Sequence, residues 1–374
     1  MNFDFSDDQK LLKDQARKFL TDNCPLTEVR DVLENDKPHA EKIWKGIAEM
    51  GFCGAAIPEQ YGGLGLGALE LCVVAEELGR ALAPIPFSSS IYLFAESLKL
   101  AGSESQNQMW LPKIASGESI GTLAMAEGVN TPGPNTIRAE FSGGTLSGIK
   151  LPVPDAEASD VAVVLCRTGG QGERALSLVL VDLSSKGITR RSVKTLDASR
   201  SYGEINFDKV PAELLGVEGE GWSHVQRVLD GAAVLFAFEQ VGGAEAALEM
   251  AKSYALERYA FGRLIGSYQA IKHKLADMYV RNELARSNAY YGAMMLNTDG
   301  AELPIAAAAA RVAASEAFCY AAQENVQTHG GIGFTWEGDC QFFYRRSRLL
   351  ALALGSETQW KEKLVRHLEA KNAA

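Results

Sequence analysis

The sequence predicts an α+β protein in which a β-domain separates two helical domains. Apolar residues recur at helical spacing before about residue 118, whereas Gly, Thr, Ser and Val become frequent from Gly121, in short alternating or apolar runs. From Gly221 the pattern returns to long helices that continue to the end of the chain. We therefore expect an N-terminal α-helical domain at residues 1–118, a β-domain at 119–221 and a C-terminal helical domain at 222–374.

The N-terminal domain begins with a capped helix. Ser6 and Gln9 have the spacing of a capping box, and apolar residues follow them at helical spacing. Further helices are expected at about residues 40–50, 69–83 and 91–101. The segment GGLGLG at residues 62–67 lacks the spacing of a dinucleotide-binding loop, so we interpret it as a turn.

The β-domain is expected to contain short strands, and the C-terminal domain an alanine-rich helix. We expect strands at about residues 160–166, 175–181 and 204–207, because turn residues bound each apolar run there. Residues 304–323 are rich in alanine at helical spacing, which permits close packing of helices and predicts the core of a bundle.

The composition is that of a globular protein and argues against several functions. With 47% hydrophobic residues, a net charge of −10 and no basic stripe, the chain does not suit a nucleic-acid partner. We found no secretory signal and no run near the roughly 18 apolar residues of a membrane span, so we expect a cytoplasmic protein. The six scattered cysteines and five histidines predict reduced, mostly buried thiols and no metal site.

Residues 257–278 (ERYAFGRLIGSYQAIKHKLADM) interrupt a long helical pattern. Gly is roughly 1 kcal/mol less favourable than Ala inside a helix, so Gly262 and Gly266 predict a break between a helix ending near Arg258 and one carrying Gln269. The break would present Arg258 beside Phe261, a pair that suits a pyrophosphate and a flat ring system. The alternative is an ordinary connection with a surface Arg and a core Phe.

A second stretch, residues 327–337 (QTHGGIGFTWE), follows the alanine-rich helix. Gly330, Gly331 and Gly333 free the backbone for tight turning and for close approach to a ligand. Together the two stretches resemble the C-terminal domain of the acyl-CoA dehydrogenase family, and the helix, β, helix order extends the resemblance over essentially the whole chain.

This resemblance implies a C-terminal four-helix bundle, FAD as cofactor and α,β-dehydrogenation of an acyl-CoA thioester. In the family, residues matching the retained motifs reach across an interface and bind the adenosine diphosphate part of the FAD held by a neighbouring subunit. The cofactor-binding residues implied here are Arg258, Phe261, Ile265, Gln269, Gln327, Gly330, Gly331 and Ser356.

The sequence departs from the family where the chemistry takes place. The usual catalytic Glu position holds Leu354, and the alternative Glu and its neighbouring Arg are Ala232 and Ala233. A leucine cannot abstract a proton, and the weak alternative base is Glu239, two helical turns beyond Ala232. The packed-carboxylate interpretation of Glu239 is favoured.

The flavin side of the β-domain departs from the family as well. Residues 126–133 replace the family's T-E-p-x-x-G-S-D, and Pro152, Val153 and Pro154 replace the W-I-[TS] that backs the flavin ring. The acidic residues of these loops, Glu127 and Asp155, are expected to be solvated.

These retained and lost residues leave three functional hypotheses. The first is a subunit that lacks its own base and completes the FAD site of a paralogous partner, as in heterotetrameric members that act on sterol side chains. The second is an active homotetramer with a displaced base, and the third is a non-enzymatic binding or scaffold protein. The resemblance implies an acyl-CoA substrate, an electron-transferring flavoprotein as acceptor and a role in lipid metabolism, either of fatty acids or of steroid side chains.

Overall fold

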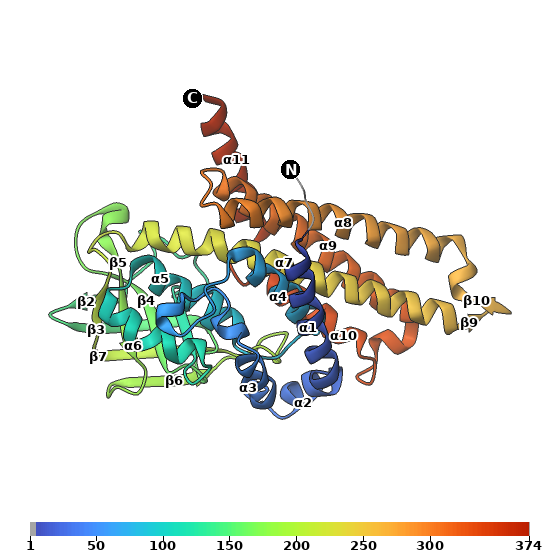
Figure 1. Cartoon of the computed structure of the whole chain (residues 1–374), viewed down its shortest axis with the longest axis horizontal. Helices are drawn as coiled ribbons and strands as arrows, with labels where there is room; N and C mark the ends of the chain where they lie inside the picture. The colour runs from blue at the N-terminus through green and yellow to red at the C-terminus, as the bar shows by residue number, and fades with distance from the viewer. Residues whose placement is uncertain (1–4, 374) are drawn as a thin grey trace. The chain divides into compact units, whose positions relative to one another are not determined.

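The computed structural model describes residues 5–373 and confirms the predicted α+β order of helices, strands and helices (Figure 1). Residues 1–4 and 374, at the outer ends of the first and third predicted domains, lie outside the described residues. Within residues 5–373 the α-helices are α1 (Asp7–Asn23), α2 (Leu26–Glu34), α3 (Glu41–Glu49), α4 (Ala68–Arg80), α5 (Glu96–Ala101), α6 (Glu104–Ala115), α7 (Gly221–Glu257), α8 (Gln269–Asn297), α9 (Leu303–His329), α10 (Cys340–Leu352) and α11 (Glu357–Ala373).

The strands form one large sheet and one hairpin. They are β1 (Gly121–Ala124), β2 (Glu140–Ser142), β3 (Thr145–Pro154), β4 (Val161–Arg167), β5 (Leu176–Asp182), β6 (Ile188–Ser192), β7 (Tyr202–Pro211), β8 (Glu213–Leu215), β9 (Tyr259–Ala260) and β10 (Arg263–Leu264).

The chain divides into two compact units. The first comprises Met1–Arg30, Ala68–Ala83 and Ala233–Ala374, and the second comprises Asp31–Gly67 and Pro84–Ala232. The first unit therefore contains α1, α4 and the C-terminal helices, while the second contains the large sheet together with α3, α5 and α6.

The large sheet of the second unit has the strand order β6-β7-β3-β2-β4-β5-β8, and β1 pairs in parallel with β4. The three predicted strands are confirmed as β4, β5 and β7, with β4 and β5 antiparallel from Val161 opposite Asp182 to Arg167 opposite Leu176. Every residue of β4 from Val161 to Cys166 is buried, because neighbours cover both faces of this strand.

The predicted N-terminal helices agree with the structure except at one place. Ser6 accepts a hydrogen bond from the Gln9 backbone, and the Gln9 side chain completes the capping box of α1. Residues 40–50 and 69–83 correspond to α3 and α4. The helix predicted at 91–101 begins earlier, as a π-helix over Ser88–Ala95 that continues into α5. The pattern did not predict α2 or α6, the latter with Pro112 inside it.

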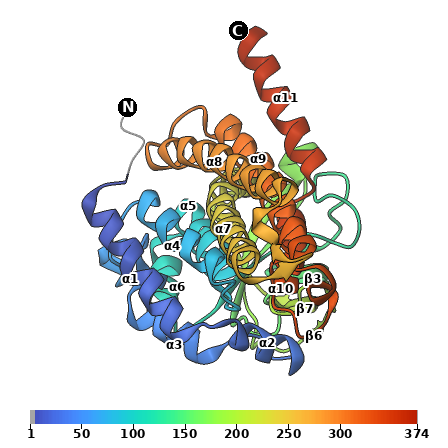
Figure 2. The same ribbon diagram turned by 90° about the vertical axis from the view of Figure 1, so that its right-hand side faces the viewer.

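In the first unit, α8 and α10 pack on α9, and Figure 2 shows α7, α8 and α9 together, nearly end-on. The alanine-rich segment is confirmed as part of α9, which packs on α8, α10 and α11. By length and composition alone, the stretch Leu303–Phe334 is apolar enough to cross a membrane, which the sequence analysis had not anticipated. Since 61% of its most apolar window is buried, we interpret it as the core helix of the bundle.

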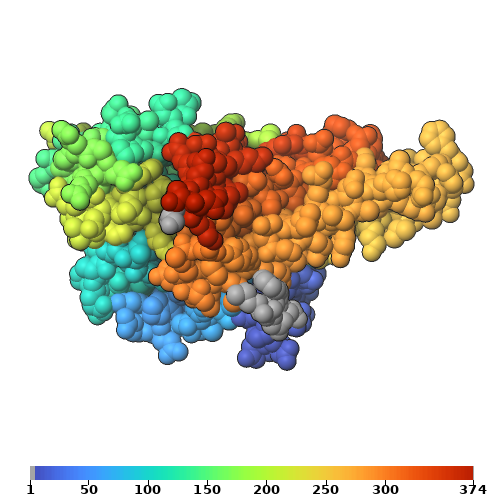
Figure 3. Space-filling view, turned by 90° about the horizontal axis from the view of Figure 1, so that it is seen from above, coloured from blue at the N-terminus to red at the C-terminus, as the bar shows by residue number. Residues whose placement is uncertain are grey.

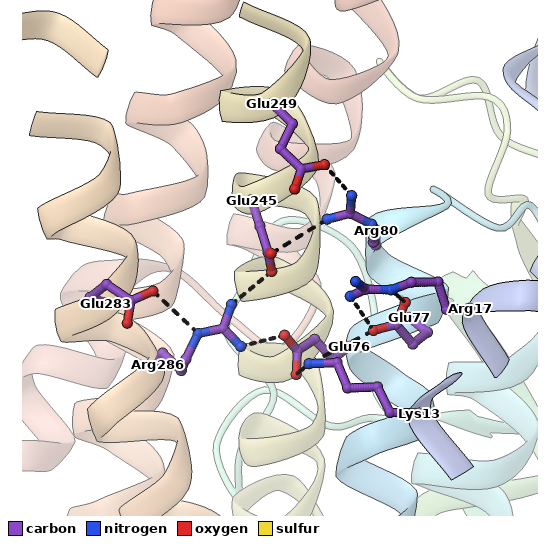
Figure 4. A network of polar contacts seen from close by, with 9 residues as sticks. All are labelled: Lys13, Arg17, Glu76, Glu77, Arg80, Glu245, Glu249, Glu283 and Arg286. Atoms are coloured by element: carbon purple, nitrogen blue, oxygen red, sulfur yellow. Dashed lines mark hydrogen bonds and ion pairs between the residues drawn. The ribbon is translucent and has the colours of Figure 1, made fainter. Parts of the chain in front are cut away.

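An ion-pair network joins four helices of the first unit (Figure 4). The carboxylates of Glu76 and Glu77 on α4 are almost fully buried, with side chains 1% exposed. Arg17 of α1 donates two hydrogen bonds to Glu77, at 2.9 and 2.8 Å. Glu76 pairs with Lys13 of α1 at 2.9 Å and with Arg286 of α8.

The network continues onto α7. Arg286 also pairs with Glu245 at 2.8 Å, and Arg80 contacts both Glu245 and Glu249. Burial alone would raise the pKa of Glu76, but Arg286 and Lys13 outweigh it and hold that pKa below its usual value. The ion pairs of this network therefore hold α1, α4, α7 and α8 together and stabilise the fold of the first unit.

We predict that Arg286→Met destabilises the chain by about 3–5 kcal/mol, because Glu76 then stays buried with only part of its compensation. Urea unfolding at about pH 7 measures this change. Arg366→Met is the matched control, since Arg366 forms an exposed pair with Glu362 and its loss should not change the free energy of unfolding measurably.

We also predict a pH dependence from the same carboxylate. The pKa of Glu76 is lower in the folded state, so its contribution is present above its ordinary pKa of 4.5 and is lost as the pH falls below that value. Between about pH 6 and about pH 3, Glu76→Gln should therefore lose less stability than the wild type. Equal losses in the two proteins would contradict the assignment.

Candidate cofactor-binding site

The connection between α7 and α8 is a short β-hairpin, which confirms the predicted break in the helical pattern. β9 and β10 pair antiparallel, and Phe261 and Gly262 form the turn with φ angles of +52° and +83°. Two consecutive positive φ values define a hairpin turn in which Asn or Gly is usual. A phenylalanine in the left-handed region costs about 1–2 kcal/mol, so this residue is held in a strained backbone conformation.

The Phe261 side chain is 98% exposed. The alternative that placed this phenylalanine in the core is therefore wrong. The β9–β10 hairpin that carries it lies at the projecting end of the first unit, coloured yellow-orange in Figure 3. Strain and full exposure together are unusual for an aromatic residue whose purpose is packing within its own chain.

Arg258 lies where α7 ends and the hairpin begins. Its backbone is fixed, because its N–H donates to the Tyr254 carbonyl at 2.9 Å and its carbonyl accepts from Ile265 at 2.8 Å. Its side chain is exposed, and within residues 5–373 no hydrogen bond or ion pair engages the guanidinium. Gln269, the exposed first residue of α8, and the half-buried Ile265 lie on the other side of the hairpin.

The Gly-rich turn, Gly330–Phe334, follows the end of α9. Gly330 has φ +60° and ψ −134°, a conformation for which glycine is required. A Cβ built on Gly330 or on Gly331 would meet nothing within 4 Å, so this side of the turn is open. Gln327 is exposed on the last turn of α9.

The structure brings the hairpin and the Gly-rich turn to the same end of the bundle. Tyr254, one turn before Arg258, stacks on His329 with ring centroids 4.2 Å apart. The Asn325 side chain donates to the Met250 sulfur at 3.4 Å, which links the same ends of α9 and α7. This stacked pair could not be predicted from the sequence, because its two residues lie 75 positions apart and no local pattern marks them.

Ser356 lies in a different connection, between α10 and α11. Its hydroxyl accepts from the Gln359 backbone at 3.4 Å, and the Gln359 side chain accepts from the Ser356 N–H at 2.7 Å. This reciprocal pair is a capping box for α11. Figures 1 and 3 show that α11 and the hairpin lie well apart along the bundle, so the structure does not bring Ser356 together with the hairpin residues.

The two positions where the family carries a catalytic Glu are apolar and buried. Leu354 is 9% exposed, and its carbonyl accepts from the Trp360 indole at 3.2 Å. Ala232 and Ala233 on α7 have no exposed surface. Neither position offers a group that can accept a proton.

Glu239 is the remaining candidate base, and its side chain is also fully buried on α7. The next residue, Gln240, accepts from Arg311 at 2.6 Å and donates to Ser315 at 3.1 Å, so this part of α7 faces the interior of the bundle. This environment is that of a packed helix carboxylate.

The expectation that Glu127 is solvated is wrong. Its carboxylate accepts from the backbone N–H groups of Arg138 and Ala139 at 2.7 and 3.0 Å, and it pairs with Lys150 at 2.7 Å. The Lys150 side chain is completely buried, and burial lowers its pKa although Glu127 opposes that shift. Glu127 therefore compensates a buried charge that lies 23 residues away in the sequence.

Asp155 is likewise buried, at 4% exposed, and not solvated. It accepts from the hydroxyls of Ser89 at 2.6 Å and Ser201 at 3.0 Å. Burial raises its pKa, while Ser89 and the Arg200 charge act in the opposite direction. The sequence analysis missed these partners because they lie 66 and 46 residues away.

The segment that replaces the family's flavin-backing tripeptide forms the end of β3. Pro152 is exposed and follows a cis peptide bond, Val153 is buried, and the Pro154 carbonyl accepts from the Thr122 hydroxyl at 2.7 Å. Neither proline has an N–H to donate, and residues 152–154 contain no indole.

Comparisons with known proteins agree with this arrangement. Residues 6–118 match the acyl-CoA dehydrogenase N-terminal domain, and residues 219–368 match the acyl-CoA dehydrogenase C-terminal domain. The acyl-CoA dehydrogenase IpdE2 of Mycobacterium tuberculosis is 30% identical to this chain over 367 residues, which cover 97% of both proteins.

Solved structures give the same result. A chain in the structure of the electron transferring flavoprotein of Acidaminococcus fermentans is 28% identical and superimposes with a TM-score of 0.92, over 98% of this chain and 99% of that one. A chain in the ChsE4-ChsE5 complex from Mycobacterium tuberculosis is 25% identical, with a TM-score of 0.88 and 99% of each chain covered. Both family domains and full-length similarity to these proteins show that the chain belongs to the acyl-CoA dehydrogenase family, whose members are FAD-binding flavoproteins.

Proposed function

We propose that this chain is a subunit of a heteromeric FAD-dependent acyl-CoA dehydrogenase that lacks its own catalytic base and completes the FAD site of a paralogous partner. One contrast carries the proposal. Within residues 5–373 the Arg258 guanidinium and the Phe261 ring are exposed and the Gly-rich turn is open at Gly330 and Gly331, whereas Leu354 occupies the position of the base.

The chemistry explains why the contrast matters. Dehydrogenation of an acyl-CoA thioester moves the α proton to a carboxylate and the β hydrogen, with its electron pair, to an acceptor that FAD supplies when bound. In this chain Leu354 and Ala232 occupy the two positions of the base and cannot take the proton. The partner subunit must therefore provide the base.

The residues of this chain fit the adenosine diphosphate part of FAD. The exposed Arg258 guanidinium can donate two hydrogen bonds to a pyrophosphate, and the exposed Phe261 ring offers a face for a flat group. At Gly330 and Gly331 a ligand can approach the backbone without meeting a side chain. The end of β3 does not fit the flavin ring in the same way, because Pro152 and Pro154 replace an indole and a hydrogen-bond donor.

Heteromeric assembly has support from a relative. The ChsE4-ChsE5 complex contains two different proteins, and one of its chains covers 99% of this chain. We extend the proposal to an acyl-CoA substrate from fatty-acid or steroid side-chain degradation, a tetrameric assembly in the cytoplasm, and an electron-transferring flavoprotein as acceptor.

The two alternatives are separable. An active homotetramer requires a displaced base, and burial of Glu239 disfavours the one candidate that the sequence offered. A scaffold protein would not depend on FAD. An adjacent reading frame encoding a second acyl-CoA dehydrogenase with an intact T-E-p-x-x-G-S-D motif and a catalytic Glu would supply the partner for co-expression.

We predict that the chain purified alone carries little or no FAD, because its own ring-binding segment is replaced at Pro152, Val153 and Pro154. The visible absorbance spectrum of the purified chain measures flavin occupancy directly. The complex co-expressed with the partner should show the flavin band, whereas near-stoichiometric flavin in the chain alone would contradict the proposal.

We predict that Leu354→Glu does not create dehydrogenase activity in the chain alone. The substitution adds a carboxylate, but it leaves the flavin-ring segment unchanged and places a charge at a buried position. Turnover of acyl-CoA substrates with an artificial electron acceptor tests this, and Leu354→Gln controls for damage to packing. Robust turnover of Leu354→Glu alone would show that the chain has an intact flavin site.

We predict that Arg258→Ala weakens FAD binding by the complex roughly 10- to 150-fold, since a charge-assisted hydrogen bond contributes about 1.5–3 kcal/mol. Arg258→Lys should recover only part of the affinity because it loses the planar fork. Gln327→Ala should have a smaller effect, because a neutral hydrogen bond contributes about 1 kcal/mol.

The control for this experiment is Lys252→Ala, which removes another exposed cation from the last turns of α7. Its FAD dissociation constant should match the wild type at equal folding stability. If Arg258→Ala also leaves the dissociation constant unchanged, the cross-subunit role is wrong.

A further inference from the structure

Arg30 of α2 contacts the loop that follows the Gly-rich turn, although the two lie more than 300 residues apart in the sequence. Its guanidinium donates to the backbone carbonyl of Trp336 at 2.9 Å and to that of Glu337 at 3.3 Å. It also pairs with the Asp339 carboxylate at 2.8 Å and lies 4.8 Å from the centroid of the Phe342 ring. One planar group thus fixes three acceptors of a single loop.

The loop at residues 330–339 needs an external support. It carries three exposed apolar side chains, Ile332, Phe334 and Trp336, so little of its apolar surface is buried to order it. Trp336 is also contacted from α10, where the Gln341 amide donates to its carbonyl at 2.6 Å and the Arg345 guanidinium stacks on its ring. Arg30 adds a contact from the N-terminal part of the chain.

We propose that Arg30 is a positioning residue for cofactor binding, and the proposal rests on the function proposed above. By fixing the carbonyls of Trp336 and Glu337, Arg30 orders the loop that begins at Gly330 and Gly331, where the adenosine diphosphate part of the partner's FAD would approach. Arg30 does not touch the cofactor itself. Its contribution is preorganisation: the loop is ordered before binding, so the ordering entropy is not lost when FAD binds.

The first measurement concerns the isolated chain and involves no cofactor. Hydrogen exchange of the backbone amides at residues 331–339 should become faster in Arg30→Ala, while the amides of the hairpin and of α8 stay unchanged. Arg30→Lys should be intermediate, because an ammonium group can reach one acceptor but cannot span three. Unchanged exchange in this loop would overturn the proposal.

The second measurement is the FAD dissociation constant of the co-expressed complex. Arg30→Ala should raise it on the order of tenfold, the effect of reordering a few side chains on binding, with the unfolding midpoint unchanged. Asp339→Asn should have a smaller effect, since it removes the charge from one of the three acceptors and keeps the two carbonyl bonds; it also serves if Arg30→Ala fails to fold. Arg366→Ala, on the exposed face of α11, is the matched control and should change neither quantity.

The outcomes separate this inference from the function on which it rests. If Arg258→Ala weakens FAD binding and Arg30→Ala does not, the positioning role is overturned while the cross-subunit function stands. If neither substitution affects FAD, both are overturned. Faster exchange in the loop together with weaker FAD binding and partial rescue by Arg30→Lys supports the positioning role.

Discussion

The first unit depends on the pairing of charges that its helices bury. Glu76 and Glu77 are almost inaccessible on α4, and such carboxylates are tolerated only with well-placed cations. Lys13 and Arg17 from α1 and Arg286 from α8 supply these cations. The ion pairs therefore fix the positions of α1 and α8 against α4. The positions of the helix ends are therefore also set by these ion pairs. This matters because the residues of the candidate site lie at helix ends.

The site itself is built from two interruptions of helical structure. These are the hairpin after α7 and the Gly-rich turn after α9. The Tyr254–His329 stack and the contact of Asn325 with Met250 hold these two helix ends together. From them the Arg258 guanidinium and the Phe261 ring face outward, and Gly330 and Gly331 carry no side chain. A ligand at this surface could contact a cation, an aromatic ring and backbone that no side chain covers.

Local patterns predicted those features that depend on neighbouring residues. The capping box at Ser6, the break marked by Gly262 and the alanine-rich α9 all follow from contacts within a few residues. The solvated interpretation of Glu127 and Asp155 was wrong because their environment is set by residues that lie far away in the sequence. The contact of Arg30 with residues 336–339 could not be predicted for the same reason, because the residues near Arg30 in the sequence give no sign of it.

The backbone at Phe261 gives a physical reason to connect the fold with an assembly. A left-handed phenylalanine is strained by about 1–2 kcal/mol, and an exposed ring buries no apolar surface to offset that strain within its own chain. Glycine or asparagine would form the same turn more stably. The position therefore makes sense if the ring is covered in a complex, where burial of an aromatic side chain contributes about 1.5–3 kcal/mol. In the proposed assembly, binding across an interface would thus offset a strain that the isolated subunit carries, and proton transfer would fall to the other subunit because the buried Leu354 offers no base.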